Sequence, residues 1–349
     1  MRPHLLPSTA ARATALGAAA LGALALLVLP PAAAVASSGA SGFTISDPRI
    51  KESSGLAASR VHPGVYWTHN DSDDGPYVYA VDSATGKTVA RITMTGVGKP
   101  RDIEAISLGP DGQLYVGDIG DNLNGSWDHV WIYRFPEPKT LGDATVKAEQ
   151  FTVKYADGPR NAEALMVHPV TGRVYIASKD ERAGGLYEGP AGPLSTTGTN
   201  TFRRIGDVPW VTDGAFSPDG GRLALRGYLW AKTYPWKDGR VAGDGESVAA
   251  PWQGQAESVT YSADGSALMM GAEGLNSRVV AVPVGPAASP AGASPGASPG
   301  ASPAAGSPPA GDPPAAGDRS FTKGAVVLVV ALALTLAAKR MLRRRPAKQ

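Results

Sequence analysis

The amino-acid sequence predicts an all-β fold: a five-bladed β-propeller closed by an N-terminal outer strand, followed by a C-terminal single transmembrane helix. Three observations carry this prediction. Between residues 43 and 284, apolar residues alternate over short runs bounded by Gly, Pro, Asp and Asn, as in half-buried strands. A strand–turn–strand unit recurs along this region, and the stretch before its first copy resembles the stretches before later copies.

The recurring unit is a strand, a tight turn and a second strand. Its copies are SSGLAASRVHPGVYWTHND (53–71), DIEAISLGPDGQLYVGDIGDN (102–122), AEALMVHPVTGRVYIASKDE (162–181), TDGAFSPDGGRLALRGY (212–228) and AESVTYSADGSALMMGAE (256–273). Pro, Asp and Gly in the turns favour tight reversals. Two further strand-like runs follow each copy except the last, which only RVVAVPV follows. We therefore expect Phe43–Ser46 to supply the missing outer strand, whereas a six-bladed ring would need a further unit that the sequence does not show.

The N-terminal 36 residues predict a cleaved signal peptide. Arg2 and Arg12 precede an Ala/Leu run, and Ala34-Val35-Ala36 supplies the small residues of a cleavage site. The chain has no Cys, so the exported domain is expected to fold without disulfides.

Residues 285–318 consist almost entirely of Ala, Ser, Pro and Gly, a composition that favours a disordered, semi-extended stalk. The apolar run GAVVLVVALALTLAA then predicts a membrane helix over residues 321–342. The basic residues that follow place the tail, residues 343–349, in the cytoplasm by the positive-inside rule. The expected protein is exported and single-pass, with an extracytoplasmic N-terminal domain.

The formal net charge of +2 combines regions of opposite character. The signal peptide and the tail are basic, so the propeller region between them is acidic. An acidic exported domain is a poor nucleic-acid binder, and we expect a small-molecule or cell-envelope ligand and a monomeric ectodomain.

Alignment of the repeats places one polar side chain at the start of each inner strand. These residues are Ser54, Glu104, Glu163, Asp213 and Glu257. Carboxylates gathered around a narrow channel repel one another unless a cation or basic side chains neutralise them. An all-oxygen ligand set favours Ca²⁺ over zinc. The alternative is structural: each acid pairs with Lys51, Arg101 or Arg160, which precede the ring position by three residues in their repeats, or accepts backbone hydrogen bonds from the next blade.

Loops between the second and third strands share the face on which the inner strands begin. THNDSDDG (68–75) is the first of these rim loops, and it lacks the spacing of an EF-hand. Candidate catalytic residues on the rim are His69, Asp71, Asp118 and Asp121. Candidate ligand-binding residues are Asn70, Asn122, Lys179, Arg226 and Glu273, and Asp180 lies in the same loops.

The ring of Ser54, Glu104, Glu163, Asp213 and Glu257 resembles the channel of the calcium-dependent apyrases, five-bladed propellers in which Ser and Glu side chains hold a central Ca²⁺. Asp213 departs from the Ser that this family has there. The stretches SGLAAS, HNDSDDG and GDIGDN also resemble exported bacterial propellers grouped with esterase-like phytases, which include WD-repeat-like proteins. These resemblances imply a phosphorylated ligand bound beside Ca²⁺ on the rim.

Three functions remain open at this point. The first is a surface-anchored binding module with a Ca²⁺ site at the channel mouth. The second is a Ca²⁺-dependent phosphohydrolase acting on a nucleotide or phosphate ester, in which a rim acid or His69 activates water. The third is a structural interaction protein whose acidic ring forms salt bridges without metal, because propellers serve all of these purposes.

Overall fold

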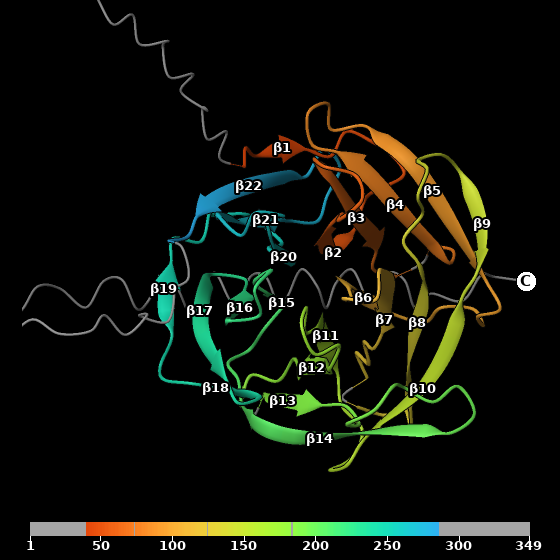
Figure 1. Cartoon of the computed structure of the whole chain (residues 1–349), viewed down its shortest axis with the longest axis vertical. Helices are drawn as coiled ribbons and strands as arrows, with labels where there is room; N and C mark the ends of the chain where they lie inside the picture. Colours follow the sequence, from red (N-terminus) through yellow and green to blue (C-terminus); the bar gives the residue numbers. More distant parts are fainter. Residues whose placement is uncertain (1–39, 73, 124, 183, 286–349) are drawn as a thin grey trace, which may run out of the picture. The chain divides into compact units, whose positions relative to one another are not determined.

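The computed structural model describes residues 40–285, except residues 73, 124 and 183. Every regular element in this part is a β-strand, and the strands are arranged around a common centre (Figure 1). The prediction of an all-β, propeller-like fold is therefore confirmed. The expected signal peptide, transmembrane helix and tail lie outside the described residues, as does the stalk beyond Gly285. Within the described ranges, no helix has the length and apolar character needed to cross a membrane.

The strands pair in sequence order, each array running from the centre outward. The first array is β2 (Ser53–Ala58), β3 (Val65–Asn70), β4 (Tyr77–Asp82) and β5 (Thr88–Thr95). The second is β6 (Ile103–Leu108), β7 (Gln113–Asp118), β8 (Val130–Pro136) and β10 (Glu149–Tyr155). The third is β11 (Ala162–Val167), β12 (Val174–Ser178), β13 (Gly185–Glu188) and β14 (Thr199–Asp207). All of these pairings are antiparallel.

The remaining strands complete the ring. One array is β15 (Asp213–Phe216), β16 (Arg222–Gly227), β17 (Trp230–Lys237) and β19 (Glu246–Val248), with β18 (Arg240–Val241) paired to the far end of β17. The other is β20 (Ser258–Tyr261), β21 (Ala267–Gly271), β22 (Arg278–Pro283) and β1 (Phe43–Thr44). The antiparallel pairing of β1 with β22 joins the two ends of the described chain in one sheet.

The innermost strands lie side by side around the centre of the molecule. β2 contacts β6, β6 contacts β11, β11 contacts β15, β15 contacts β20, and β20 returns to β2. Figure 1 shows these strands surrounding the centre, with later strands of each array farther out. The starts of the inner strands therefore lie together at one end of this ring, called the channel mouth below, which positions the side chains considered next.

Two outer features differ from the repeat pattern. β9 (Ala144–Lys147) pairs in parallel with β5 and so extends the first array. β10 pairs in parallel with β14, which joins the second and third arrays into one eight-stranded sheet. The sequence does not predict β9, because its side chains are mostly exposed and lack an apolar alternation.

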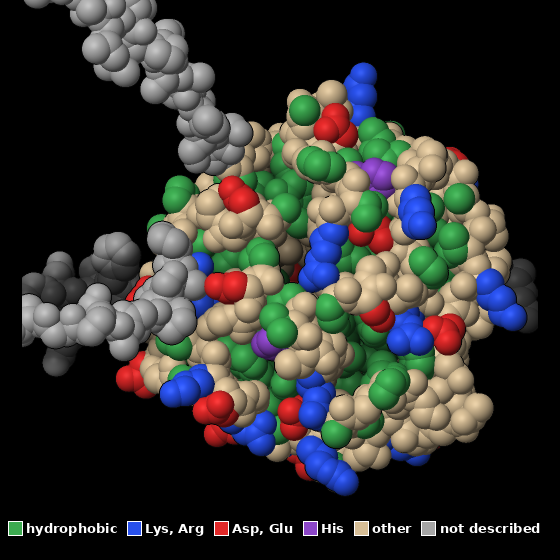
Figure 2. Space-filling view, in the orientation of Figure 1, with side chains coloured by type: hydrophobic (Ala, Val, Ile, Leu, Met, Phe, Trp, Pro, Cys, Tyr) green, Lys and Arg blue, Asp and Glu red, His purple; other side chains and the backbone are tan. Residues whose placement is uncertain are grey.

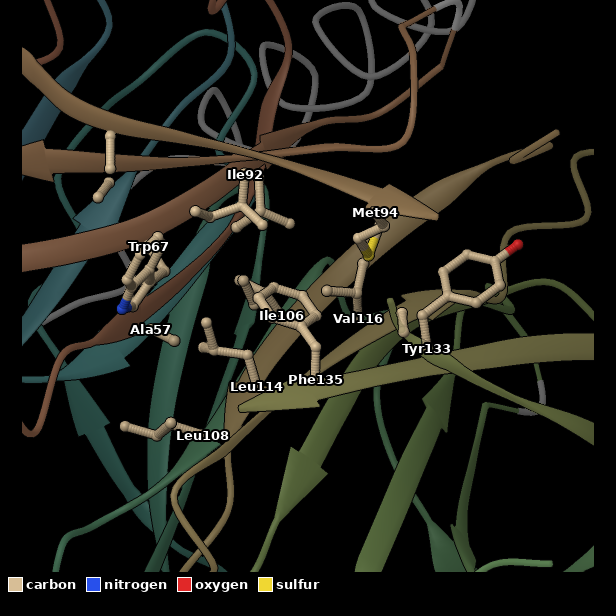
Figure 3. Packing of buried hydrophobic residues seen from close by; sticks show 14 of the residues in the cluster. Ala57, Trp67, Ile92, Met94, Ile106, Leu108, Leu114, Val116, Tyr133 and Phe135 are labelled. Atoms are coloured by element: carbon tan, nitrogen blue, oxygen red, sulfur yellow. The ribbon is translucent and has the colours of Figure 1, made fainter. Parts of the chain in front are cut away.

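The core between the first two arrays is built around Trp67, which is completely buried. Its indole Nε1 donates a 2.8 Å hydrogen bond to Oε1 of Glu137. Ile92, Ile106 and Phe135 belong to the same cluster (Figure 3). Large apolar side chains between neighbouring sheets thus hold adjacent arrays together, since burial of each contributes roughly 1.5–3 kcal/mol.

Replacing Trp67 with Ala is expected to lower the free energy of unfolding by about 3–5 kcal/mol, because it leaves a cavity and removes one of the hydrogen bonds to Oε1 of Glu137, which keeps that from Ser59. Trp252 is 72% exposed, so Trp252→Ala is a matched control with an expected change within about 0.5 kcal/mol. Urea denaturation of both variants measures the difference. Equal losses would contradict the placement of Trp67 in the core.

Candidate metal centre

Irregular pairing at the start of three inner strands marks the channel mouth. The register shifts between Ser53 and Leu56 in β2, between Ile103 and Ala105 in β6, and between Ala162 and Ala164 in β11. These bulges contain the predicted ring residues Ser54, Glu104 and Glu163. A β-bulge leaves a residue outside the regular ladder and redirects its side chain. The bulges therefore explain why these side chains depart from the regular alternation of a strand near the channel mouth.

A compact group of carboxylates lies at this mouth. Asp71, Asp102 and Glu104 each offer an oxygen, and these oxygens lie within 4.8 Å of one another. Ser54 Oγ donates to Oε2 of Glu104 at 3.3 Å. A Cβ at Gly120 would lie 2.6 Å from oxygens of both Asp102 and Glu104. Only glycine at position 120 lets these carboxylates keep their places.

The carboxylates of this group are held in an environment that opposes their ionisation. Burial, followed by the charge of Asp102, raises the pKa of Asp71 well above its usual range. Burial, followed by the charge of Asp71, raises the pKa of Glu104 well above its usual range. Oδ1 of Asp71 is buried and accepts no hydrogen bond from the described residues. A cation bound here would remove the repulsion and supply the missing partner.

The opposite side of the mouth contains its own cation. Nζ of Lys179 lies 2.9 Å from Oε1 of Glu163 and donates to the hydroxyl of Tyr228 at 3.1 Å. Burial alone would lower the pKa of Lys179, but the charges of Glu163 and Glu257 outweigh it and raise that pKa well above its usual range. Glu257 is 4% exposed, and its pKa is raised to about 8 by burial, against the opposing charge of Lys179.

Amide side chains connect the two sides. Asn122 donates through Nδ2 to Oδ2 of Asp102 at 2.7 Å and accepts from Nδ2 of Asn161 at 3.3 Å. Asn161 also donates to Oε1 of Glu163 at 3.4 Å. The predicted binding residue Asn122 thus orients Asp102 directly and is linked through Asn161 to Glu163 of the next array.

The predicted ring is brought together only in part. The residues that lie at the mouth are Ser54, Glu104, Glu163 and Glu257. Both carboxylate oxygens of Asp213 instead accept hydrogen bonds from backbone N–H groups, those of Gly214 and Val259, each at 2.7 Å. Burial raises the pKa of Asp213 well above its usual range, although these N–H groups oppose the effect. Asp213 thus joins β15 to β20.

Arg226 was predicted to bind ligand on the rim, but its side chain is completely buried. Its NH1 donates to the carbonyl oxygens of Ser258 and Gly271, each at 2.6 Å, and its NH2 donates to Oε1 of Gln253 at 2.7 Å. Burial lowers the pKa of Arg226 to about 10. The guanidinium therefore holds β16 against β20 and β21 of the neighbouring array.

Several other predicted rim residues bind backbone as well. Asn70 accepts through Oδ1 from the N–H groups of Lys51 and Glu52. Asp118 accepts from the N–H groups of Arg101 and Asp102 and from the hydroxyl of Tyr133 at 2.6 Å. Asn70 and Asp118 occupy the same position in their arrays, at the ends of β3 and β7, and each fixes the segment that leads into the inner strand, β2 or β6.

Asp121 is also completely buried. Its Oδ2 accepts from the N–H of Trp127 at 2.6 Å, and its Oδ1 accepts from Ser126 Oγ and the N–H of Leu123, each at 3.4 Å. The side chain stabilises its own loop rather than the mouth.

His69 differs most from its expected position. It lies within β3, not in an open loop, and its side chain is completely buried. Nδ1 lies 3.1 Å from the carbonyl oxygen of Asn70, while Nε2 is buried without a hydrogen-bond partner among the described residues. Burial lowers the pKa of His69 to about 4. Strand alternation explains the difference, since adjacent residues point to opposite faces and Asn70 takes the face toward Lys51 and Glu52.

Two of the three basic residues expected to neutralise the ring, Arg101 and Arg160, have other contacts. The Arg101 guanidinium lies between the rings of Trp127 and Trp131, 4.0 and 3.8 Å from their centroids. Arg160 forms an ion pair with Asp157 at 2.9 Å. The neutralising base at the mouth is instead Lys179.

Asp102, Asn161 and Tyr228 are site residues that the sequence prediction missed. Asp102 and Asn161 each lie two positions before a ring glutamate. Gln255 occupies the same position before Glu257, and its Nε2 donates to Oε2 of the predicted rim residue Glu273 at 2.6 Å. Alternate residues in an extended chain share a face, so the recurrence of polar residues two positions before the ring glutamates could have predicted that they face the mouth. No comparable pattern in the sequence predicts Tyr228.

A separate cavity of about 100 Å³ opens at the other end of the inner strands. Leu56, Ile106, Leu108, Phe216 and Tyr261 line it together with small and hydroxyl-bearing residues. It contains none of the predicted site residues. Figure 2 shows one face of the ring, where acidic and basic side chains are interspersed with apolar ones.

Comparison with known proteins adds little to this geometry. No protein-family model matches the chain, and no curated protein matches it in sequence. Among solved structures, the PQQ-bound aldose sugar dehydrogenase of Streptomyces coelicolor matches with a TM-score of 0.42 and 13% identity, over 69% of this chain and 96% of that one. Hydrazine synthase of Kuenenia stuttgartiensis matches with a TM-score of 0.36 and 13% identity, over 62% of this chain and 61% of that one. At these values the likenesses carry no functional argument.

The raised pKa of Glu257 predicts a pH dependence of stability in metal-free protein. A carboxyl whose pKa rises from 4.5 to about 8 on folding stabilises the fold below about pH 4.5, and that stability is lost as the pH rises through about 8. His69, with its pKa lowered from 6.5 to about 4, acts in the opposite direction but only below about pH 6.5. The melting temperature in EGTA should therefore fall between pH 6.5 and 8.

Glu257→Gln removes one titrating group from this window and should make the fall shallower. Differential scanning calorimetry of the two proteins across the window measures the slopes. Identical slopes would mean that Glu257 does not titrate there.

Proposed function

We propose that the chain is a five-bladed, cell-surface propeller whose channel mouth binds Ca²⁺ and recognises an extracytoplasmic small ligand or partner. The ring of inner strands β2, β6, β11, β15 and β20 supports the blade count. Ca²⁺ would be held by Asp71, Asp102 and Glu104. Of the ring expected from the resemblance to apyrases, this proposal keeps Glu104 as a ligand and adds two aspartates.

The observation that carries the Ca²⁺ proposal is the convergence of three carboxylates within 4.8 Å, together with a buried Asp71 oxygen that accepts no hydrogen bond from the described residues. Ca²⁺ prefers carboxylate oxygens and tolerates irregular coordination, which suits a set drawn from two arrays. With several acidic ligands and no His or Cys, zinc fits less well.

Binding has more support than phosphoester hydrolysis. Of the side chains expected to activate water, His69 is buried, and Asp118 and Asp121 are occupied by hydrogen bonds. Asp71 remains at the mouth, where its role would be that of a metal ligand. A bound Ca²⁺ would supply positive charge for attracting an anionic group of the ligand.

Added Ca²⁺ should raise the melting temperature of the ectodomain. At a concentration about 100 times the dissociation constant, linkage gives about 2.7 kcal/mol, or roughly 5–10 °C for a domain of this size. Asp102→Asn and Glu104→Gln should abolish the rise without lowering the melting temperature in EGTA, because each also relieves repulsion.

Exposed Asp244 provides a matched control, and Asp244→Asn should keep the full Ca²⁺ response. Thermal unfolding with Ca²⁺ or EGTA tests all variants. A wild-type protein that does not respond to Ca²⁺ would favour the structural reading of the acidic mouth.

Anchoring belongs to the same proposal and rests on the composition of residues 1–36, 285–318 and 321–342. Protease treatment of intact cells should release an ectodomain fragment, because a stalk of this Ala, Ser, Pro and Gly composition would be accessible to protease. Immunoblotting of the supernatant detects the fragment. A chain that resists protease until the cells are lysed would contradict surface exposure.

A further inference from the structure

The mouth contains a second cluster of carboxylates that Lys179 occupies. Its ammonium contacts Glu163 at 2.9 Å and Tyr228 at 3.1 Å, and its charge also acts on Glu257 and Glu104. Glu163, Glu257 and Glu104 come from three different arrays. The lysine side chain is only 15% exposed, and its ammonium contacts Glu163, one of the carboxylates that a metal ion would use.

We propose that Lys179 is a built-in cation that occupies a latent second divalent-cation site formed by Glu163 and Glu257, and thereby limits the mouth to one metal ion. This inference rests on the proposed Ca²⁺ site at Asp71, Asp102 and Glu104. Lys179 acts as a specificity-determining residue, because it sets how many metal ions the mouth accepts and on which side.

An orphaned oxygen indicates that this second site is more than a salt bridge. Oε2 of Glu257 is buried and has no hydrogen-bond partner among the described residues. Lys179 therefore neutralises the pair without satisfying every oxygen. A divalent ion binds several oxygens at once at 2.3–2.6 Å, so it could satisfy both carboxylates where a single ammonium does not.

Electrostatics explains why the lysine and a second metal ion exclude each other. Two cations a few ångströms apart in a buried site repel strongly, since the interaction scales inversely with distance and local dielectric. With the ammonium held beside Glu163, a metal ion is favoured on the Asp71 side, where Oδ1 of Asp71 has no hydrogen-bond partner among the described residues. Removing the ammonium charge leaves Glu163 and Glu257 as uncompensated ligands.

Calcium titration calorimetry on the purified ectodomain tests the inference. Wild-type protein should bind one Ca²⁺, and Lys179→Met should bind two. Lys179→Gln provides a second neutral variant that can still hydrogen-bond to Glu163 and Tyr228, which guards against loss of folding. Lys179→Arg, which keeps the charge, should bind one, as should the exposed-residue control Lys139→Met.

The outcomes separate the inference from the function on which it rests. If wild type and both neutral variants each bind one Ca²⁺ with unchanged affinity, the role of Lys179 is refuted while the Ca²⁺ site stands. If wild type binds none, the proposed function fails, and with it the inference. Adding Glu257→Gln to Lys179→Met should return the stoichiometry to one; a double variant that still binds two would also overturn the assignment of the second site.

Discussion

Repulsion among buried carboxylates at one mouth of the channel is the interaction on which the arrangement of the site depends. The inner strands of neighbouring arrays begin at this mouth, so acids that are far apart in sequence meet there. Burial and mutual repulsion both raise the pKa values of Asp71 and Glu104. Each ionised carboxylate must therefore be offset locally, and the two sides of the mouth differ in how this is done.

On one side, the positive charge that balances the carboxylates belongs to a residue of the chain itself. Lys179 contributes its charge to Glu163 and Glu257, and Tyr228 holds the ammonium in place. On the other side, Glu104 accepts a hydrogen bond from Ser54 and Asp102 accepts one from Asn122, both neutral donors, and Oδ1 of Asp71 has no hydrogen-bond partner among the described residues. Neutral donors orient carboxylates, but they cannot cancel several negative charges. This asymmetry is the physical reason for placing a metal ion on the Asp71 side.

Acidic residues have different roles in this fold because some accept hydrogen bonds from backbone N–H groups and others do not. Asp118 and Asp213 each accept from two backbone N–H groups, and Asp121 also binds its own loop. Hydrogen bonds to the charged form stabilise it and consume its lone pairs. Such residues hold segments together and have little capacity left for a ligand. At the mouth, Asp71 and Glu257 each keep a buried oxygen without a hydrogen-bond partner among the described residues, and these oxygens remain available to a cation.

The sequence predicted the strands well, because tight turns and period-two alternation are local signals. It also placed Ser54, Glu104, Glu163 and Glu257 near one another, since the repeats align them. Direction was harder to predict: His69 and Asn70 were assigned to the same rim, yet neighbouring strand residues point to opposite faces. The bulges at Ser54, Glu104 and Glu163 depend on pairing with the next strand, which no single segment encodes. Strand β9 depends on the edge offered by β5, a tertiary contact.

A channel lined by apolar residues or by complete ion pairs would make a more stable fold than this one. Replacement of buried charges by well-packed apolar groups is often neutral or stabilising. This mouth instead keeps acidic side chains, two of which have a buried oxygen without a hydrogen-bond partner among the described residues. Local conflicts of this kind are expected where function opposes stability. Asp213 and Arg226, by contrast, bind backbone groups on both sides of the interface between their array and the next. The acids at the mouth instead leave carboxylate oxygens that a cation can bind.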